Sequence, residues 1–335
     1  MPNPIKYNKK FDELDEEEKK LLELNKKTIA DFVEQSSSIS DVNYATRNAH
    51  AKTYAAAKGT FQIEPDLPES LQPFFDKDKF DLIIRFSNAQ LKIKNSGKDL
   101  PAYGFAVQIK DENGGLLANY PLVNFPLFPV NSVSTFLKLF TAVNKFYIKK
   151  WSSLFPLLIQ VIKMIPSLLT GDMIRHMIRL FGKRNDFILS FDYYSIGAYR
   201  LGDQIIKIKI MPQSVDKNIG RKQKTGDALK NYLQAHDFAA DVLIQVCYNL
   251  KDQPINKLNV EWKNSPFIKI GEIKIKKGSL LDARECTNEL LSFNPFESKI
   301  FFQPVGKIQK LRDDAYKISV QTRRKINKLL HGKNS

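Results

Sequence analysis

The sequence is poor in the residues that build disulfide frameworks and multi-ligand metal sites. It has two cysteines, Cys247 and Cys286, and four histidines in 335 residues. Two cysteines are too few for a disulfide framework, and no CxxC metal spacing is present. Cys247 lies in an apolar run, so we expect a buried thiol there. With four histidines in the chain, a multi-histidine metal site is not expected.

Several enzyme and export signatures are also missing. The chain contains none of the patterns GxxxxGK[ST], GxGxxG, HExxH and GxSxG, which argues against the nucleotide, zinc-protease and serine-hydrolase sites that these patterns build. No apolar signal-peptide core follows Met1, so we predict a cytoplasmic location. The longest uncharged apolar run, 151–162, is shorter than the ~18 residues needed to span a bilayer.

Positive charge is in excess. The chain carries 52 Lys and Arg against 36 Asp and Glu, a net charge of +16. Such a balance favours anionic partners such as nucleic acid or lipid headgroups. The lysines, however, alternate with isoleucines instead of clustering with aromatic residues. We therefore take a solvated basic surface as the default and predict no nucleic-acid partner.

The apolar pattern predicts an α+β fold, an antiparallel β-barrel with helical additions. Ile206–Ile210 and Ile273–Lys276 alternate isoleucine with lysine, which predicts strands with one dry face and one wet face. Many strands with few βαβ units favour an antiparallel barrel, expected at about 60–300. The predicted strands are Phe61–Ile63, Leu82–Phe86, Phe105–Ile109, Leu116–Leu122, Ile206–Ile210, Val242–Cys247 and Ile268–Ile275.

Helical patterns flank and interrupt the barrel. An N-terminal arm, 1–43, contains a predicted helix at 12–35, and the main domain is expected at 44–335. The segment 134–182 looks helical with breaks at Pro156 and Pro166. Core packing against the barrel is the expectation for its apolar residues. The alternative is a peripheral membrane or lipid contact through 151–182, because basic residues flank the apolar ones. Two more helices are expected, at 227–239 and 309–331.

The last predicted helix carries a chemically suggestive stripe. Arg312 and Tyr316 are four residues apart, and Val320 and Arg323 continue the same face. A guanidinium beside a phenol favours the phenolate, which is a hard anionic ligand for ferric iron, and tyrosine is a known proximal haem ligand. Arg323 could pair with a haem propionate. Alone, the stripe is better explained as an amphipathic basic helix with a packed tyrosine.

A second candidate lies near the start of the chain. His50 follows a predicted loop, and Ser87 belongs to the segment Arg85-Phe86-Ser87. A neutral imidazole near an open iron site can take a proton from peroxide and deliver it to the departing oxygen. Ser87 could hold that imidazole in the required tautomer. Taken alone, His50 would be interpreted as a surface or capping histidine.

In order and approximate spacing, the motifs resemble those of the catalase-like haem proteins. The match runs from about Tyr44 to Lys328 and is most similar to short bacterial members that lack the C-terminal helical domain. Each motif alone is weak, and the ordered set is fairly specific. The motifs are Arg47-Asn48-Ala49-His50-Ala51-Lys52, Arg85-Phe86-Ser87, Gly104-Phe105-Ala106-Val107, Asn124-Phe125-Pro126-Leu127-Phe128, Leu291-Ser292-Phe293-Asn294-Pro295-Phe296 and Arg312-x-x-x-Tyr316.

The resemblance implies a haem b (iron) cofactor and a role for each matching residue. His50 would be the distal acid–base residue, with Ser87 as its support. Tyr316 would bind the iron, and Arg312 would activate it. The remaining residues implied to hold or line the haem pocket are Arg47, Arg85, Arg323, Phe128 and Phe136.

One catalytic position stays open. The family presents two adjacent asparagines before a Thr-Pro, one of which orients peroxide, whereas 122–126 offers a single asparagine. A gapless count puts Val123 at that place, and a one-residue shift puts Asn124 there as a catalytic residue. The family's Pro-Asp-Thr after the tyrosine is replaced by 317–319, Lys-Ile-Ser. Ala49 lacks the hydroxyl of the threonine that restrains catalase activity in the related allene oxide synthases.

These observations predict an enzyme that decomposes hydrogen peroxide or organic hydroperoxides by catalase or peroxidase chemistry. One alternative is a fatty-acid hydroperoxide isomerase or lyase similar to allene oxide synthase. An alternative of another class is a haem-free barrel that binds lipid or an anion. The physiological peroxide, the reductant and the oligomeric state stay open.

Overall fold

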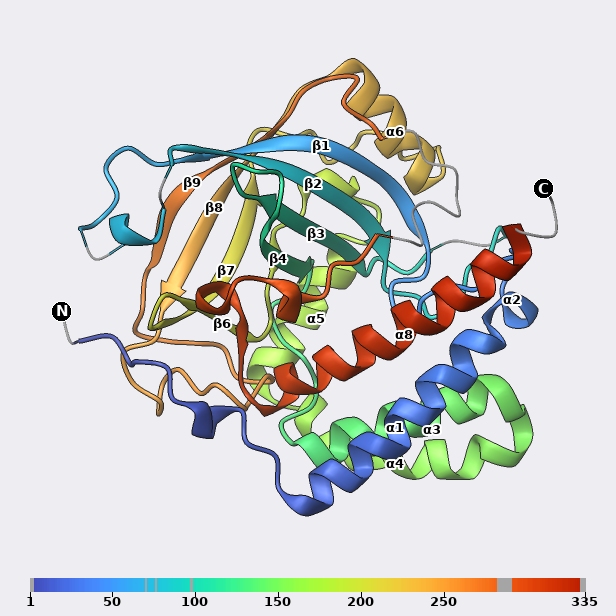
Figure 1. The fold of residues 1–335 in the computed structure, drawn as a ribbon. Coiled ribbons are helices and arrows are strands. Elements are labelled where there is room, and N and C mark those ends of the chain that lie inside the picture. Colours follow the sequence, from blue (N-terminus) through green and yellow to red (C-terminus); the bar gives the residue numbers. More distant parts are fainter. Residues whose placement is uncertain (1–2, 70, 76, 97–98, 282–290, 332–335) are drawn as a thin grey trace.

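The main body of the protein is a β-barrel (Figure 1). The computed structural model describes residues 3–69, 71–75, 77–96, 99–281 and 291–331. Within these residues, eight antiparallel strands close into a ring in the order β7-β5-β4-β3-β2-β1-β9-β8, and β8 pairs back to β7. The short strands β6 and β10 extend the sheet from β7. The α+β barrel predicted from the sequence is confirmed.

The strands agree well with the predicted runs. All seven runs fall within strands, except that Cys247 follows the end of β8, and β1 begins well before the predicted run. Cys247 is a buried thiol, and Cys286 lies outside the described residues. The strands are β1 Thr53–Ile63, β2 Lys79–Asn88, β3 Tyr103–Lys110, β4 Leu116–Val123, β5 Tyr193–Tyr194, β6 Ala198–Leu201, β7 Gln204–Pro212, β8 Phe238–Val246, β9 Phe267–Ile275 and β10 Pro304–Val305.

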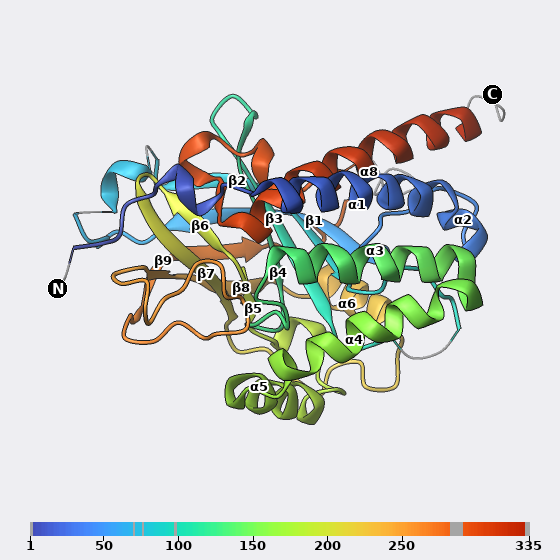
Figure 2. The same ribbon diagram turned by 90° about the horizontal axis from the view of Figure 1, so that it is seen from below.

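The N-terminal arm begins with a well-capped helix, α1 (Glu16–Glu34). Asp15 and Glu18 form a reciprocal capping box, which satisfies two backbone N–H groups at the helix start. The short helix α2 (Ser36–Ile39) follows where the sequence predicted an end to helical structure. Figure 2 shows α1 lying between the helices α3 and α8.

Three helices make up the predicted insertion: α3 (Val133–Lys149), α4 (Leu154–Leu168) and α5 (Gly171–Gly182). The predicted breaks at Pro156 and Pro166 are wrong. Pro156 stands in the first turn of α4, where its missing N–H leaves no helical bond unmade, and Pro166 lies inside α4. The chain instead turns at Lys150, whose φ is 50°.

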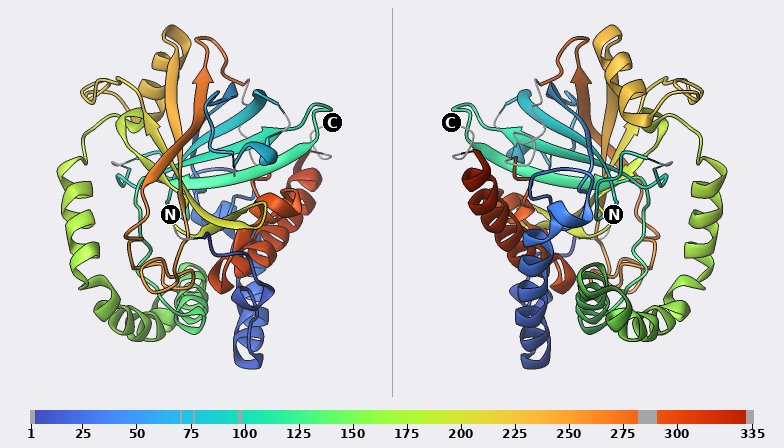
Figure 3. Two further views of the ribbon diagram at one scale, coloured as in Figure 1. Left: turned by 90° about the vertical axis from the view of Figure 1, so that its left-hand side faces the viewer. Right: turned by 90° about the vertical axis from the view of Figure 1, so that its right-hand side faces the viewer.

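The expectation that the insertion packs its apolar residues into the core is wrong for α4. None of the residues of α4 is buried, and Figure 3 shows the green helical segment along one outer edge of the molecule. One stretch, Val133–Leu168, is long and apolar enough to cross a membrane by composition alone. It comprises α3, a 3₁₀ turn and α4.

The two other helices predicted from the sequence, at 227–239 and 309–331, are both present. α8 (Lys307–His331) agrees with the helix predicted at 309–331. α6 (Thr225–Ala235) ends earlier than predicted, because β8 already begins at Phe238 and takes the last residues of 227–239. The 3₁₀ turns are η1 Lys9–Phe11, η2 Gln72–Phe74, η3 Lys150–Ser153, η4 Ile188–Ser190, η5 Pro295–Glu297 and η6 Ile300–Phe302.

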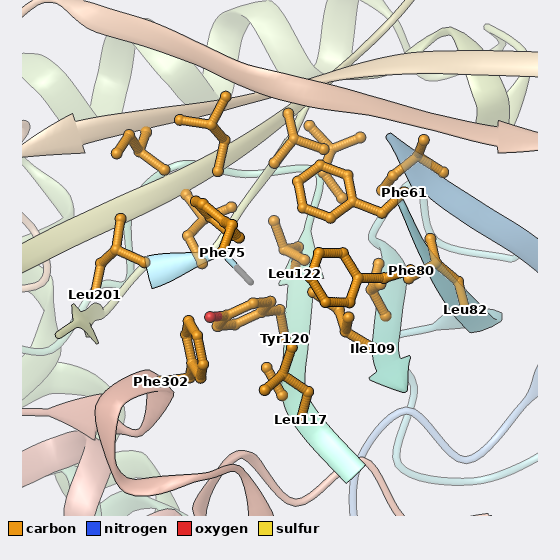
Figure 4. Close-up of a pocket in the computed structure, with 18 of the residues that line it drawn as sticks. Phe61, Phe75, Phe80, Leu82, Ile109, Leu117, Tyr120, Leu122, Leu201 and Phe302 are labelled. Carbon is orange, nitrogen blue, oxygen red and sulfur yellow. The ribbon is translucent and has the colours of Figure 1, made fainter. Parts of the chain in front are cut away.

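The interior of the barrel is dry. Ile206, Ile208 and Ile210 share one face of β7, as predicted, and line an apolar cavity of about 40 Å³ inside the barrel. Figure 4 shows other side chains that line this cavity, among them Phe61 and Leu122. The predicted wet face is wrong at Lys207, which is 9% exposed and lies 5.0 Å from the centre of the Trp262 ring. Burial lowers the pKa of Lys207 to about 8. The loop that carries Trp262 therefore covers this part of the outer face.

Candidate functional site

A second, larger cavity lies against the outer face of the barrel. Its volume is about 310 Å³, at the lower end of the range for ligand pockets. Strands β2, β3 and β4 form one wall, and helices α1, α3 and α8 contribute residues to the others. Segments from nearly the whole length of the chain therefore meet at this one cavity, which we call the outer cavity.

The barrel gives the outer cavity a floor of mostly small side chains. Strand pairing places six of the lining residues in two rows across β2, β3 and β4, and these rows are Ser87–Gly104–Val123 and Arg85–Ala106–Pro121. Because side chains alternate along a strand, the intervening Phe86 and Phe105 are buried in the barrel core. The floor leaves room above the sheet where larger residues would fill it.

His50 reaches the floor from the loop before β1. Its φ is 50°, a left-handed conformation that is uncommon outside glycine. Hydrogen bonds hold this conformation on both sides. Arg85 Nη2 donates to the carbonyl oxygen of His50 at 2.7 Å, and the N–H of Ala51 donates to the carbonyl of Gln90 at 3.0 Å. The imidazole is therefore positioned by the barrel wall itself.

Ser87 and Gly104 fix the imidazole from below. His50 Nδ1 lies 3.2 Å from Ser87 Oγ. A Cβ atom at Gly104 would stand 2.5 Å from that Oγ and 2.7 Å from Nδ1, so a side chain there would displace the pair. Burial, together with the nearby charges of Arg85, Arg312 and Arg47, lowers the pKa of His50 from 6.5 to about 3. The imidazole is neutral at neutral pH.

Helix α8 presents its predicted stripe to the outer cavity. Arg312, Tyr316, Val320 and Arg323 all line it. The Arg312 guanidinium lies 5.8 Å from the centre of the Tyr316 ring, and its Nη1 donates to Gln309 Oε1 at 2.7 Å. The structure thus brings the phenol of α8 and the imidazole of the β1 loop to the same cavity.

Four arginines line the outer cavity, three of them less than a tenth exposed. Arg47 donates to the carbonyl of Leu291 at 2.9 Å, and Arg323 donates to Ser319 Oγ at 2.8 Å. Although burial opposes the charged form, the phenols of Tyr199 and Tyr316 raise the pKa of Arg312. This set of guanidinium groups favours an anionic occupant.

Three phenylalanines form an aromatic wall. The rings of Phe136 and Phe140 are stacked with centres 4.5 Å apart, and Phe128 stacks on Phe140 at 6.2 Å. All three line the outer cavity. Phe128 and Phe136 were predicted, and Phe140 follows Phe136 by one helical turn of α3.

Asn124 is not among the residues that line the cavity. Its Oδ1 accepts from the N–H of Tyr103 at 2.7 Å, and its Nδ2 donates to the carbonyl of Pro101 at 3.0 Å. The amide is therefore occupied by backbone away from His50. Val123 lines the cavity instead. Of the two positions that the sequence left open, the structure places Val123 in the cavity lining and Asn124 outside it.

The arm helix α1 also contributes to the site, which the sequence did not indicate. Asn25 and Ile29 line the outer cavity. Asn25 Nδ2 donates to Thr141 Oγ1 of α3 at 3.0 Å. On the same side, Asn48 of the His50 loop donates to Asn144 of α3 at 2.9 Å. These bonds tie the arm and the loop to α3 and close that side of the cavity.

A metal centre of the multi-ligand kind is not visible in the part of the chain that the structure describes. No group of three or more His, Cys, Asp or Glu side chains there could hold a metal ion.

Comparison with known proteins identifies the fold. No protein-family model matches the sequence, and no curated protein matches it either. Among solved structures, a fungal catalase matches with a TM-score of 0.60 at 15% identity, catalase A of Saccharomyces cerevisiae with 0.61 at 17%, and a bacterial catalase with 0.60 at 17%. Each match covers 84% of this chain.

The chain spans about three fifths of the length of these catalases, with 59%, 62% and 57% of them covered in the same order. At this level of identity the match establishes the fold and nothing finer. The barrel, the helices around it and their order are those of a catalase-like fold.

Proposed function

We propose, starting from the catalase-like fold, that the protein is a haem enzyme that decomposes peroxides. The observation that carries the proposal is that His50 and Tyr316, from opposite ends of the chain, line one cavity of about 310 Å³. The expected substrates are hydrogen peroxide and organic hydroperoxides, used in catalase or peroxidase chemistry. The cytoplasmic location stays a prediction.

The residues around the outer cavity fit a planar, dianionic macrocycle. Gly104 and Ala106 keep the floor flat, and the stacked rings of Phe136 and Phe140 offer an aromatic wall. Arg47, Arg85 and Arg323 would pair with the propionates of haem b. Tyr316 would be the iron ligand, with the Arg312 guanidinium 5.8 Å from the centre of its ring.

Bound haem would supply the redox chemistry of O–O bond cleavage, and the chain supplies the proton transfer. With Nδ1–H of His50 donating to Ser87 Oγ, the Nε2 atom keeps its lone pair. Nε2 then accepts a proton from the peroxide and returns it to the departing oxygen. The low pKa of His50, caused by burial and the neighbouring arginines, keeps Nε2 available at neutral pH.

The residue at position 123 influences which peroxide reaction the site favours. Val123 lies in the same cross-strand row as Gly104 and Ser87, so an aliphatic side chain stands where a donor amide would orient hydrogen peroxide. The proposal therefore favours peroxidase or weak catalase activity over rapid disproportionation. The same apolar wall supports the alternative, a fatty-acid hydroperoxide isomerase or lyase. Product analysis separates the two: an alcohol indicates peroxidase chemistry, whereas an epoxide or cleavage product indicates the alternative.

The first experiment tests the cofactor by its absorption spectrum. Wild-type protein expressed with a haem supply is expected to show a Soret band, and Tyr316→Phe is expected to lose it. Tyr194→Phe is the matched control, because Tyr194 lines the same cavity and is expected to keep the band. A wild-type protein without a Soret band would support the haem-free barrel instead.

The second experiment tests the acid–base role. His50→Ala is expected to keep the Soret band and to lose peroxide turnover by a factor on the order of 10²–10⁴, the usual contribution of a positioned proton-transfer group. His236→Ala is the control, because His236 is exposed on the surface. Full turnover in His50→Ala would remove the distal role.

A further inference from the structure

The outer side of α4 and α5 exposes an unusual amount of apolar surface. Phe155, Leu158, Ile162, Ile165 and Leu169 are between 41% and 73% exposed. Their spacing of three, four, three and four residues places them on one stripe of the helix. A surface helix of a soluble domain normally turns such a stripe inward.

Helix α5 continues the pattern. Ile174, Ile178 and Phe181 are 41%, 68% and 59% exposed, at a helical spacing of four and three. Met173 and His176, on the other side of the helix, are buried. The apolar stripe of α5 therefore faces solvent although the helix has a packed inner side. We call the exposed apolar residues of α4 and α5 the α4–α5 face.

Basic residues accompany the α4–α5 face. Between residues 149 and 184 the chain has seven Lys and Arg and a single acidic residue, Asp172. Lys149 and Lys150 are exposed and stand next to Trp151, which is 83% exposed. Tryptophan and lysine at the edge of an apolar stripe are the side chains that favour the membrane–water interface.

We propose that the α4–α5 face is a docking surface for a lipid bilayer that contains anionic lipids. The apolar stripes enter the acyl boundary, and the flanking lysines and arginines meet the negative headgroups. This interaction surface is independent of the cofactor and goes beyond the proposed peroxide chemistry.

The geometry favours a helix that lies on the bilayer over one that crosses it. α4 has 15 residues, about 22 Å at ~1.5 Å per residue, which is short of the ~30 Å hydrocarbon core. The preceding helix, α3, cannot lengthen α4 into a membrane-spanning segment, because α3 is packed against the rest of the protein. In α3, Leu137 and Asn144 are fully buried, so withdrawing α3 into lipid would open the outer cavity.

Charge also distinguishes a bilayer from a second copy of the chain. A symmetric dimer through the α4–α5 face would bring two such patches together, each with five more positive charges than negative ones when Glu261, which pairs with Arg175, is counted with Asp172 (seven minus two). Like charges across an interface are unfavourable, whereas anionic headgroups complement them.

Vesicle flotation with the full chain tests the proposal. Wild-type protein is expected to float with phosphatidylglycerol–phosphatidylcholine vesicles and to bind pure phosphatidylcholine more weakly, with binding reduced by high salt. Absence of flotation with the anionic vesicles would overturn the proposal.

A matched pair of variants tests the apolar stripes. Ile162→Ser with Ile178→Ser removes side chains that are 62% and 68% exposed, and partitioning is expected to weaken on the order of 100-fold because two inserted isoleucines are lost. Leu100→Ser with Ile300→Ser is the control, since these residues are 60% and 58% exposed elsewhere on the molecule. Equal flotation of the two variants would overturn the proposal.

A second pair tests the charge. Replacing Lys149, Lys150 and Lys163 by Gln is expected to weaken binding to anionic vesicles by about fivefold per lysine. Replacing Arg324, Lys325 and Lys328 by Gln removes the same charge from exposed positions of α8 and is expected to leave binding nearly unchanged. A larger loss in the α8 variant would place the binding surface there and overturn the assignment.

Solution size distinguishes the competing occupants. If the wild type runs as a dimer that the Ile162→Ser/Ile178→Ser variant dissolves, and the wild type does not float with vesicles, a second copy covers the face and the proposal is wrong. A monomeric wild type that floats with anionic vesicles supports the bilayer.

Discussion

The inner cavity and the outer cavity lie on opposite faces of the same strands. The inner one, about 40 Å³, is lined by hydrophobic side chains, with Tyr120 as the polar exception (Figure 4). The outer one, about 310 Å³, is lined by four arginines, a histidine and two tyrosines among apolar and uncharged polar residues. Strands β2, β3 and β4 contribute to both. Alternation along a strand thus assigns one residue to the barrel core and its neighbour to the lining of the outer cavity.

Residues 104 and 105 of β3 make this comparison experimentally accessible. Phe105 is fully buried, and its ring packs against Phe86 with centres 4.9 Å apart and against Tyr193 at 5.1 Å. Gly104 forms part of the floor of the outer cavity. A substitution at one position should change the free energy of unfolding, and a substitution at the other should change turnover.

The largest expected effect is that of Phe105→Ala on stability. Removing a fully buried phenylalanine is expected to lower the free energy of unfolding by about 3–5 kcal/mol. Urea denaturation measures it, and turnover per folded molecule is expected to stay close to that of the wild type. Should Phe105→Ala fail to fold, Phe105→Leu provides a milder series. A normal unfolding midpoint would contradict the assignment of Phe105 to the core.

Gly104→Ala is expected to have the next largest effect, on turnover. The added Cβ would stand 2.5 Å from Ser87 Oγ and 2.7 Å from His50 Nδ1, so one of these groups must move. A displacement of about 1 Å at a reacting group can cost on the order of 100-fold in rate. Gly182→Ala is the control, because a Cβ there meets nothing within 4 Å. Equal turnover in both variants would show that His50 tolerates the shift.

A third effect concerns pH. Burial and the neighbouring arginines lower the pKa of His50 to about 3 in the folded protein without bound cofactor. Between pH 6.5 and 3 the unfolded chain therefore binds a proton at His50 that the folded chain does not. The free energy of unfolding falls as the pH is lowered through this window.

Urea denaturation at pH 7 and at pH 4.5 measures how much the free energy of unfolding falls on acidification. This decrease is expected to be larger in the wild type than in His50→Gln, by on the order of 2 kcal/mol. His236→Gln, at an exposed position, is expected to retain the wild-type loss. Identical acid losses in wild type and His50→Gln would mean that the buried imidazole titrates normally.

The comparison between the two faces also explains what the sequence could predict. Alternation of isoleucine with lysine located β7 and β9, and the inward residues followed from it. Lys207 broke the rule because Trp262, 55 residues later in the sequence, covers it. Which face of a strand meets water depends on segments that periodicity within the strand does not describe.

The lining of the outer cavity could be named from the sequence where a residue belongs to one of the motifs, and not where it depends on strand register. His50, Tyr316 and the arginines were singled out by the ordered set of motifs that resembles the catalase-like haem proteins, since each motif alone had a plainer structural explanation. The flat floor depends on Ala106 and Pro121 lying beside Arg85, which is known only once the strand register is known. For the apolar stripe of α4 the sequence favoured core packing and kept an exposed lipid contact as the alternative, for a related reason. Periodicity gives the stripe but does not show which element, if any, covers it.

The smallest expected effect tests the neighbours Val123 and Asn124, which differ in the direction of their side chains. Val123→Asn would place a donor amide on the cavity floor beside Gly104, and a rise in hydrogen peroxide turnover on the order of 10-fold is expected. This gain is smaller than the 10²–10³-fold loss in rate that follows removal of an evolved, positioned hydrogen-bond donor, because no neighbouring residue holds the new amide in place. Oxygen release measures it.

Asn124→Ala is expected to change stability and not turnover, the reverse of Val123→Asn. Its amide holds the backbone of Pro101 and Tyr103, so its loss leaves a buried N–H and a carbonyl unpaired and is expected to cost about 1–3 kcal/mol of stability. Turnover per folded molecule is expected to stay unchanged, because the side chain does not reach the outer cavity. The contrary result would be that Asn124→Ala loses turnover without losing stability while Val123→Asn gains no turnover. In that case Asn124, and not Val123, would contact the substrate, and the comparison between the two residues would be wrong.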